Sequence, residues 1–361
     1  MTRFASPASR DTALLVAAVA AEIGYIDAVN ARRRSLLCDN AQSINPVMRL
    51  YSTEAMKERR DALDGVKSDP EKALVAFIEK LLSTTESRPL TLPPRIDAVR
   101  SLRSEFPNCS AAVDLLENAV ALAHLEPRSS PQFTPMLLSG PPGVGKTEFS
   151  KRAAAVFGVN LHRLQFAHAT ASFSLGGLDL QYSSGGPGWL ARTMASSRTA
   201  DPFVLLDEID KTPADRSSDP LGALFTLWED TASEFMDDAL KVGMNLSAIR
   251  WIATCNDPGS MNAALLSRCS LIEVAPPTLD QSRDIARAIF ASLVEDGDWG
   301  NHFDAVLADD VLDALVQGGP RAMKQRLRFA LGRAAAARRS RLTVADLPHQ
   351  GAGSRRIGFH F

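Results

Sequence analysis

The stretch GPPGVGKT at residues 140–147 constrains the fold more than any other part of this sequence. An apolar run, MLLS, precedes it at 136–139, and an Ala-rich segment that ends near Gly158 follows it. A glycine-rich turn between a strand and a helix, closed by Lys and Thr, is typical of a phosphate-binding loop. Backbone N–H groups of such a loop point at phosphate oxygens, and the helix N-terminus adds partial positive charge. The pattern therefore predicts an α/β nucleotide-binding fold.

The residue types in this stretch suit separate tasks. Gly140, Gly143 and Gly145 allow the backbone to curl around the phosphates. Lys146 supplies a positive charge for the β- and γ-phosphates, and the hydroxyl of Thr147 can ligate Mg²⁺. The expected nucleotide-binding residues are Gly140, Pro141, Pro142, Gly143, Val144, Gly145, Lys146 and Thr147.

The stretch PFVLLDEIDK at 202–211 reads as an apolar strand that ends in acids. Its carboxylates should emerge at the carboxyl edge of the sheet, where α/β folds bind ligands. We expect Asp207 to hold Mg²⁺, and Glu208 to orient and polarise the attacking water. Acids after a buried strand often only cap the next helix, but their combination with the loop at 140–147 favours the catalytic interpretation.

Three further polar residues follow in order along the chain. Asn256 closes the strand-like run RWIATC, where its carboxamide could contact the γ-phosphate or the same water. The sequence NDPG is also an ordinary turn. Arg268 and Arg321, considered singly, have the character of solvated surface charges.

The pattern of apolar residues changes along the chain. Residues 11–84 show helical spacing with little proline, SRPLTLPPR at 87–95 suggests a linker, and a further helix is expected near 110–125. From residue 136, short apolar strands alternate with helices, which predicts a parallel sheet flanked by helices. Helical spacing returns after about residue 280.

Composition limits the expected partners and compartment. A chain of 361 residues with 45% apolar residues can form two or three domains. Its net charge of −2 gives no general attraction to nucleic acid or to a membrane. The four cysteines lack metal-site spacing, so we expect reduced thiols in a cytoplasmic protein. The apolar run at 13–21 continues past Glu22 and Asp27 at helical spacing, which favours a helix over a secretion signal.

A basic run from Arg321 to Arg341 contains no acidic residue, which raises nucleic acid as a partner. Its apolar residues, among them Met323, Leu327 and Leu331, recur at helical spacing. We therefore favour a helix with a charged outer face, and nucleic acid stays a less favoured partner.

From Gly140 to Arg268 the chain resembles the AAA+ module of Lon proteases, and the likeness extends less densely through Arg321. The residues that carry it go beyond the phosphate-binding loop. They are DEIDK at 207–211, DP at 219–220, AL at 223–224, FMD at 235–237, and NLS at 245–247 leading into WIATCN.

The resemblance implies roles for single residues. Asn256 is similar to the sensor 1 residue, Arg268 to the arginine finger that reaches the neighbouring subunit's γ-phosphate, and Arg321 to the sensor 2 arginine of a small helical lid. A finger that acts in trans implies a homo-oligomeric ring, a hexamer in this family, with ATP and Mg²⁺ as cofactors. EFPNCS at 105–110 departs from the family's adenine-side motif, so adenine preference is implied by the family alone.

The stretch LQYSSGGPGWL at 180–190 falls where Lon-like modules carry pore loop 1, whose aromatic-aliphatic pair grips unfolded polypeptide. The matching residues are Tyr182 and Ser183, so the aromatic is present and its aliphatic partner is absent. An aromatic ring can press against any extended chain. The alternative is that Tyr182 packs the loop onto its own domain.

The resemblance also has limits. Lys324 is the last lysine, so a Ser-Lys proteolytic dyad downstream of the lid is not expected, and the amino-terminal region does not resemble the Lon substrate-binding domain. The predicted division is a helical N-terminal region at 1–92 for partner or substrate recruitment, an AAA+ large α/β subdomain at 93–275, an AAA+ small helical lid at 276–345 and a tail at 346–361.

We therefore expect an ATPase that remodels, unfolds or disassembles a protein partner without intrinsic proteolysis. Two alternatives stay open. One is a nucleotide-dependent assembly switch that threads nothing, and the other is an ATP-driven motor or loader on nucleic acid.

Overall fold

The computed structural model describes residues 45–348 apart from 64, 66–67, 127–128, 167–172, 212–220, 296, 298–301 and 305. The helices predicted within 11–44, the DP pair at 219–220 and nearly all of the predicted tail lie outside the described residues.

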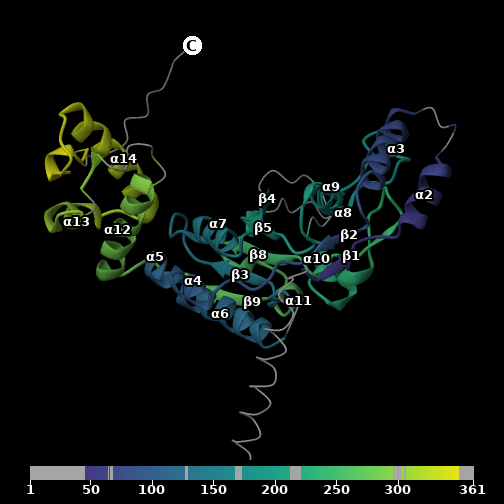
Figure 1. Cartoon of the computed structure of the whole chain (residues 1–361), viewed down its shortest axis with the longest axis horizontal. Coiled ribbons are helices and arrows are strands. Elements are labelled where there is room, and N and C mark those ends of the chain that lie inside the picture. Colours follow the sequence, from purple (N-terminus) through teal and green to yellow (C-terminus); the bar gives the residue numbers. More distant parts are fainter. Residues whose placement is uncertain are drawn as a thin grey trace, which may run out of the picture. The chain divides into compact units, whose positions relative to one another are not determined.

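A parallel five-stranded sheet forms the centre of the protein (Figure 1). Its strands lie in the order β4-β5-β8-β3-β9, so β8 and β3 separate β5 from β9. All four strand pairs are parallel, as the alternation of strands and helices predicts. The strands are β3 (Met136–Ser139), β4 (Leu161–Gln165), β5 (Phe203–Asp207), β8 (Arg250–Cys255) and β9 (Ser270–Glu273).

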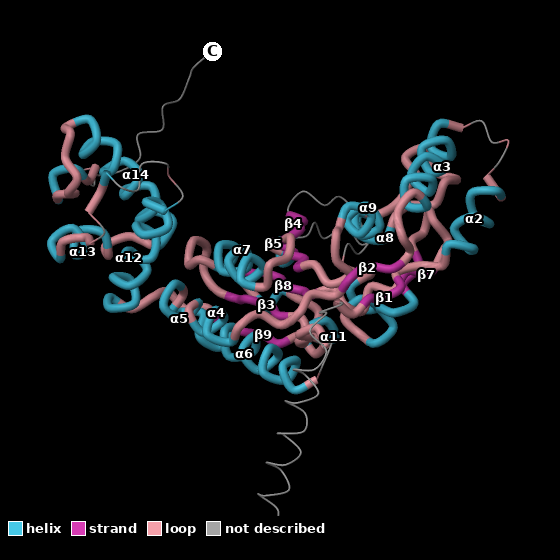
Figure 2. The backbone as a smooth tube through the Cα atoms, viewed as in Figure 1, coloured by secondary structure: helices cyan, strands magenta, loops and turns pink. Residues whose placement is uncertain are grey.

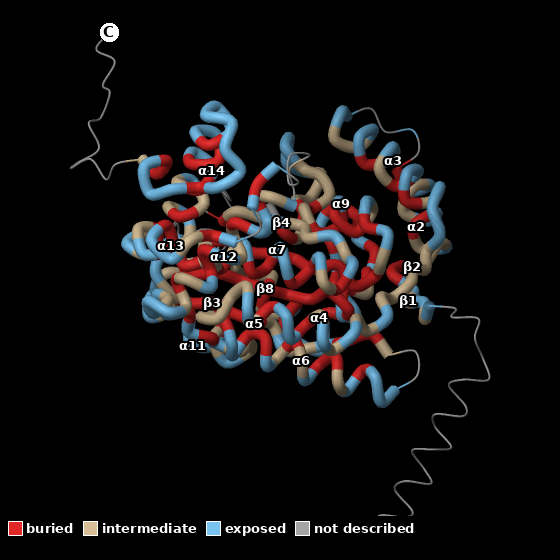
Figure 3. Tube along the Cα trace, turned by 60° about the vertical axis from the view of Figure 1, so that its left-hand side comes forward, coloured by how far each residue is buried: buried red, intermediate tan, exposed pale blue. Residues whose placement is uncertain are grey.

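Both faces of the sheet are covered, which explains why its central strands are continuously apolar. Figure 3 shows buried residues along β8, and alternate residues of β5 and β8 enter two different hydrophobic clusters. One cluster lies with α4 (Ile96–Arg100), α5 (Leu102–Glu105), α6 (Ser110–Leu125) and α7 (Lys146–Val156). The other lies with α9 (Trp189–Ser196), α10 (Leu224–Leu227) and α11 (Ala263–Leu266).

Short elements connect these layers, and Figure 2 shows their helical and extended segments. They are α8 (Phe173–Gly176), the 3₁₀ turns η1 (Pro107–Cys109), η3 (Ile209–Lys211), η4 (Asp230–Glu234) and η5 (Pro258–Ser260), and the hairpin strands β6 (Phe235–Met236) and β7 (Gly243–Met244).

The segment before residue 92 belongs to the core of the large subdomain. It contains β1 (Val47–Arg49), α2 (Thr53–Asp61), α3 (Asp69–Leu82) and β2 (Ser87–Pro89). Side chains of this segment join the hydrophobic cluster that also holds α9 and α10, and the N–H of Asn245 donates to the carbonyl of Leu50 at 2.7 Å.

Two sequence-based expectations for this segment need correction. The linker predicted at 87–95 is wrong over its first residues, because β2 pairs with β1 in antiparallel register and Arg88 is buried. The helical prediction is confirmed for α2 and α3 but is wrong at β1. The boundary drawn at residue 92 therefore does not separate two hydrophobic cores.

Residues after β9 form a helical unit with a hydrophobic cluster of its own. Its helices are α12 (Leu279–Glu295), α13 (Asp309–Leu315) and α14 (Pro320–Ala336), followed by the 3₁₀ turn η7 (Val344–Asp346). Asp346 closes the unit, because it accepts hydrogen bonds from Thr343 and pairs with Arg339. None of the described helices combines the length and the apolar character needed to cross a membrane.

A fully buried ion pair and its hydrogen bonds join four parts of the chain. Arg250 at the start of β8 pairs with Asp201 at 2.7 Å, and both side chains have no exposed surface. Asp201 also accepts hydrogen bonds from Thr91 and Ser130, and the guanidinium lies over the ring of Phe203. Burial lowers the pKa of Arg250, while the carboxylate of Asp201 opposes that shift. The pair therefore joins the segment after β2 to the entry of the sheet.

We expect Asp201→Ala to lower the free energy of unfolding by about 3–5 kcal/mol, because it leaves a buried guanidinium without its counter-charge. Urea denaturation followed by circular dichroism would measure the loss. Asp284→Ala is the matched control, since it removes an exposed ion pair with Arg287 and should cost less than about 1 kcal/mol. Equal losses in the two variants would contradict a structural role for the buried pair.

Candidate nucleotide site

The turn between β3 and α7 has the backbone that a phosphate-binding loop requires. Gly145 has φ 108° and Gly143 has φ 85°, a region that only glycine adopts readily. A Cβ on Gly140 would lie 2.2 Å from the carbonyl oxygen of Val274. The glycines are therefore needed to turn the chain from the end of β3 into the N-terminus of α7.

Lys146 and Asn256, 110 positions apart in the sequence, lie together at this turn. The ammonium of Lys146 donates to the carbonyl of Pro141 at 3.1 Å and to Oδ1 of Asn256 at 3.2 Å, and it also contacts the carbonyl of Gly140. Burial lowers the pKa of Lys146, and nearby acids oppose the shift. Because β3 and β8 are neighbours, their carboxyl ends bring these two residues to one site.

Asp207 lies under the first turn of α7 and is surrounded by donors. The hydroxyl of Thr147 is 3.3 and 3.4 Å from its two carboxylate oxygens, and the hydroxyl of Thr254 donates to Oδ1 at 2.5 Å. Arg163 donates through Nε to Oδ2 at 2.9 Å and forms a second bond through its Nη2. The Asp207 carboxylate is therefore contacted by side chains from one helix, α7, and from two strands, β8 and β4.

The hydroxyl of Thr147 and the carboxylate of Asp207 could hold a divalent cation. Both supply hard oxygen ligands, which Mg²⁺ prefers, and they face each other at the N-terminus of α7. Arg163 occupies Oδ2, so that oxygen can reach a cation or its water only when the guanidinium shares it or moves away. The two oxygen ligands therefore fit Mg²⁺, provided that Arg163 shares or releases Oδ2.

Glu208 has an unusual backbone and a partner for its side chain. Its φ is 57°, which is uncommon for any residue other than glycine, and its N–H donates to the hydroxyl of Thr254 at 2.9 Å. The carboxylate pairs with Lys211 at 2.7 Å, and this hydrogen bond raises the pKa of Lys211. Glu208 is therefore at the edge of the site, with its carboxylate held by the following turn.

Three residues of the site were not predicted from the sequence. Arg163 and Thr254 contact Asp207 from β4 and β8, and Asp210 accepts hydrogen bonds from the N–H groups of Asn256 and Asp257 at 2.8 and 3.1 Å. Arg163 and Thr254 belong to no local motif. Only the position of Asp210 within DEIDK offered a signal for its role.

Arg268 lies apart from these residues. Its guanidinium pairs with Glu229 at 2.5 Å, donates to the carbonyl of Ala264 at 2.6 Å and stacks over the ring of Phe225. Arg268 lies between α11 and the amino end of β9. The site residues lie at or beyond the carboxyl ends of β3, β5 and β8, which form the opposite edge of the parallel sheet. The structure therefore does not bring Arg268 into the nucleotide site of its own subunit.

Arg321 is exposed in the first turn of α14. This turn lies near the loop, because a Cβ on Gly319 would be 3.9 Å from the carbonyl oxygen of Gly143. Lys324 also lies 3.9 Å from Glu148 on α7. The start of α14 thus approaches the phosphate-binding turn.

Residues 105–110, EFPNCS, also contact the phosphate-binding turn. Asn108 donates to the carbonyl oxygens of Val144 and Ala275, both at 3.1 Å. The ring of Phe106 packs edge-on against Phe149 of α7. Burial raises the pKa of the Cys109 thiol to about 12, so this thiol stays protonated. The stretch is therefore part of the wall beside the turn.

Tyr182 and Ser183 are at the tip of a tight loop. Leu178 and Gly186 exchange two backbone hydrogen bonds of 3.0 and 2.9 Å, and Tyr182 is 53% exposed. Ser183 is exposed as well. The ring of Tyr182 is therefore not buried against its own domain.

Asp237 holds the base of this loop. It is buried, and it accepts hydrogen bonds from the N–H of Gly188 at 2.8 Å and from the N–H groups of Ala239 and Leu240. A Cβ on Gly177 would lie 2.6 Å from the same carboxylate. Burial raises the pKa of Asp237, and the hydrogen bonds that it accepts oppose this shift.

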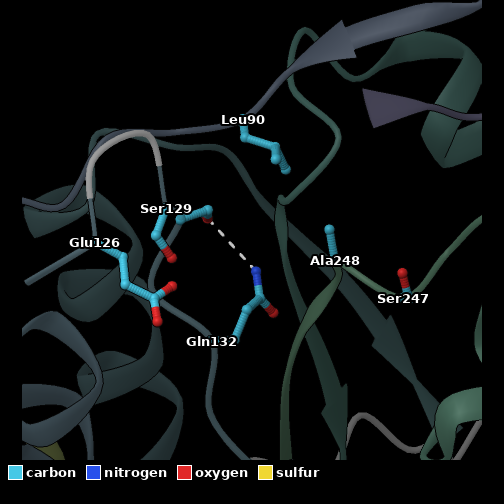
Figure 4. A pocket seen from close by; sticks show the side chains of 7 residues that line it. Leu90, Glu126, Ser129, Gln132, Ser247 and Ala248 are labelled. Carbon is cyan, nitrogen blue, oxygen red and sulfur yellow. Dashed lines mark hydrogen bonds between the residues drawn. The ribbon is translucent and has the colours of Figure 1, made fainter. Parts of the chain in front are cut away.

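A separate pocket of about 420 Å³ is lined by Leu90, Glu126, Ser129, Ser130, Gln132, Ser247 and Ala248 (Figure 4). It lies before β8 begins, whereas Asn256 follows the other end of that strand. None of the predicted site residues lines it.

Comparisons with known proteins agree with this fold. Residues 136–276 match the family described as "ATPase family associated with various cellular activities (AAA)". Lon protease 1 of Syntrophotalea carbinolica is 30% identical over 206 residues, which is 55% of this chain and 25% of that protein. Lon protease of Rhizobium meliloti is 34% identical over 173 residues, which is 47% of this chain and 21% of that protein.

A solved S. cerevisiae Hsp104:casein complex in an extended conformation has a similar fold, with a TM-score of 0.55 and 18% identity over 78% of this chain and 51% of that one. The parallel sheet and the match over residues 136–276 show an AAA+ ATPase fold in this part of the chain. Over this region the chain is similar to the AAA+ module of Lon proteases. The chain spans about a quarter, or less, of the length of the Lon relatives it matches.

We expect Asp237→Asn to loosen the loop that carries Tyr182, because one of its three N–H donors would then face an amide NH₂ instead of an oxygen. An unsatisfied buried group of this kind costs about 1–3 kcal/mol. Hydrogen exchange should show faster exchange at Gly188 and unchanged exchange at Leu205 in β5. Asp238→Asn is the control, since its side chain is 67% exposed. A similar effect in this control would contradict the prediction.

Proposed function

We propose that this protein hydrolyses ATP to remodel, unfold or disassemble a protein partner, and that it works as a ring. The observation that carries the proposal is the separation of Arg268 from a site where Lys146, Thr147, Asp207 and Asn256 lie together. Such a site has its phosphate-binding groups, and the arginine that it contains, Arg163, is engaged with Asp207, so a neighbouring subunit would supply the arginine for the γ-phosphate. No step of the proposal requires peptidase activity.

In this proposal the turn at 140–147 and the N-terminus of α7 bind the phosphates. Lys146 moves its ammonium from the carbonyl oxygens of the turn to the β- and γ-phosphates. Asn256 donates through its carboxamide to the γ-phosphate or to the attacking water. Thr147 and Asp207 would hold Mg²⁺, which would supply positive charge to the phosphates when bound.

Glu208 is the proposed general base. Its carboxylate is paired with Lys211, so it has to leave this partner before it accepts a proton from the attacking water. The left-handed backbone of Glu208 keeps the side chain beside the site. Glu208 would therefore act as a base only after the γ-phosphate and its water have bound.

We propose a hexameric ring with Arg268 acting in trans and Arg321 reporting the nucleotide state from the lid, residues 276–345. The nearness of Gly319 to Gly143 supports this role, because a change at the phosphates can then reach the start of α14. The contact between lid and loop would convert hydrolysis into domain rotation. The N-terminal region predicted at 1–92 would recruit the partner.

The exposed Tyr182 supports contact with polypeptide. An aromatic ring can press against an extended chain without reading its sequence. Ser183 in place of an aliphatic residue would forgo about 1–2 kcal/mol of apolar contact per subunit. The Hsp104 of similar fold was solved in complex with casein, a protein, which is in keeping with a protein substrate here.

We expect Arg268→Ala to retain ATP binding and to reduce hydrolysis at least about a thousandfold, since it removes the arginine of the neighbouring site. Lys146→Ala should lose ATP binding. In an equal mixture of the two variants, about a quarter of the interfaces would join an intact loop to an intact arginine. Phosphate release should therefore recover to about a quarter of the wild-type rate. A mixture as inactive as its components would contradict action in trans.

We expect Tyr182→Ala to abolish polypeptide binding while ATP hydrolysis stays within about twofold of wild type, because the ring is exposed at the tip of its loop and no proposed phosphate-binding group is changed. Binding is measured by anisotropy of a labelled unstructured polypeptide, with Glu208→Gln in both proteins to stop turnover. Tyr182→Phe should keep binding, and Ser183→Ile should strengthen it. Unchanged binding by Tyr182→Ala would favour the assembly switch, and salt-sensitive stimulation by DNA would favour the nucleic-acid motor.

A further inference from the structure

The guanidinium of Arg268 is held by groups from two separate segments. Glu229, between α10 and η4, forms an ion pair with Nη2, and the carbonyl of Ala264 in α11 accepts a hydrogen bond from Nη1. The ring of Phe225 lies 5.4 Å from the guanidinium carbon. The Nε–H group is buried and finds no acceptor among the described residues.

These contacts orient the guanidinium and leave some of its N–H groups free to donate to another acceptor. Arginine has five N–H groups, and both terminal nitrogens keep one N–H that neither Glu229 nor Ala264 uses. The side chain of Arg268 is 27% exposed. An arginine at this position can therefore donate to a phosphate without first breaking its contacts with its own subunit.

The ion pair contributes little to folding. Glu229 is 42% exposed, and partly exposed ion pairs are worth little in stability. A free arginine side chain has many rotamers, however, and must lose that freedom when it donates to a phosphate. Contacts made in advance reduce the loss, because the planar group already has its orientation.

We propose that Glu229 is a positioning residue that sets the orientation of Arg268 for the nucleotide site of the neighbouring subunit. The proposal rests on the role in trans proposed above for Arg268. Phe225 supports the plane of the guanidinium from one face, and Glu229 holds its edge. Glu229 thereby acts on hydrolysis through Arg268 and does not contact the nucleotide.

The test compares Glu229→Gln with wild type in steady-state ATP hydrolysis. Loss of the charged acceptor should lower kcat about tenfold with an unchanged KM for ATP, since the nucleotide-binding groups stay intact. Glu234→Gln is the control, because Glu234 is exposed in η4 and should leave kcat unchanged. Circular dichroism and light scattering establish that each variant folds and forms the same oligomer as wild type.

Two further measurements separate positioning from a merely structural effect. Glu229→Gln in the Arg268→Ala background should cause no additional loss, because both changes act through one group. Glu229→Gln mixed with Lys146→Ala should regain activity, since Lys146→Ala subunits supply a correctly held arginine.

The proposal is overturned if Glu229→Gln hydrolyses ATP at the wild-type rate or faster. A faster rate would mean that the ion pair restrains Arg268. An additional loss in the double variant, or no recovery in the mixture, would equally overturn it. The proposed function fails separately: if Arg268→Ala itself hydrolyses ATP normally, Arg268 is not the arginine in trans, whatever Glu229 does.

Discussion

The parallel pairing of β3 with β8 and of β8 with β5 is the constraint on which the site depends. Each strand ends at, or leads into, a residue of the site. Parallel strands in register place their carboxyl ends at one edge of the sheet. Lys146 follows β3, Asp207 ends β5, and Asn256 follows β8. Because the strands are buried on both faces, the register cannot slip without moving the apolar side chains out of the two clusters.

Asp207 shows how much of the site is preformed. Its carboxylate is held by Thr147, Thr254 and Arg163, so its orientation is set before any nucleotide arrives. Lys146 is held in a similar way by carbonyl oxygens and by Asn256. Preformed groups lose little freedom when the phosphates bind, which is the condition for strong electrostatic stabilisation. Glu208 and Arg268 differ, because both are paired with residues that do not take part in phosphate binding.

Local patterns were enough to predict the loop and the parallel sheet, and the resemblance to Lon modules implied that Asn256 lies at the same site as Lys146. They could not predict Arg163, because its bond to Asp207 depends on how β4 lies against β5 and not on any spacing along the chain. The strand at 87–89 was missed for another reason. It has only three residues and contains a proline, and its buried Arg88 is satisfied by hydrogen bonds to the turn at Thr84 and Thr85. A pattern of apolar residues cannot reveal such a strand.

In the proposed function, Tyr182 and Arg268 share a physical problem, since each would act on something outside its own subunit and must therefore be accessible. An exposed side chain on a mobile support would lose too much freedom on contact. In both cases a carboxylate supports the group, a buried one for Tyr182 and a partly exposed one for Arg268. Asp237 holds the backbone beneath Tyr182, and Glu229 holds the guanidinium of Arg268 directly. The two carboxylates lie on one continuous segment, 229–237, that leads through β7 into β8 and so to Asn256. A shift of β8 on nucleotide binding would therefore reach the polypeptide loop and the arginine through the same stretch of chain.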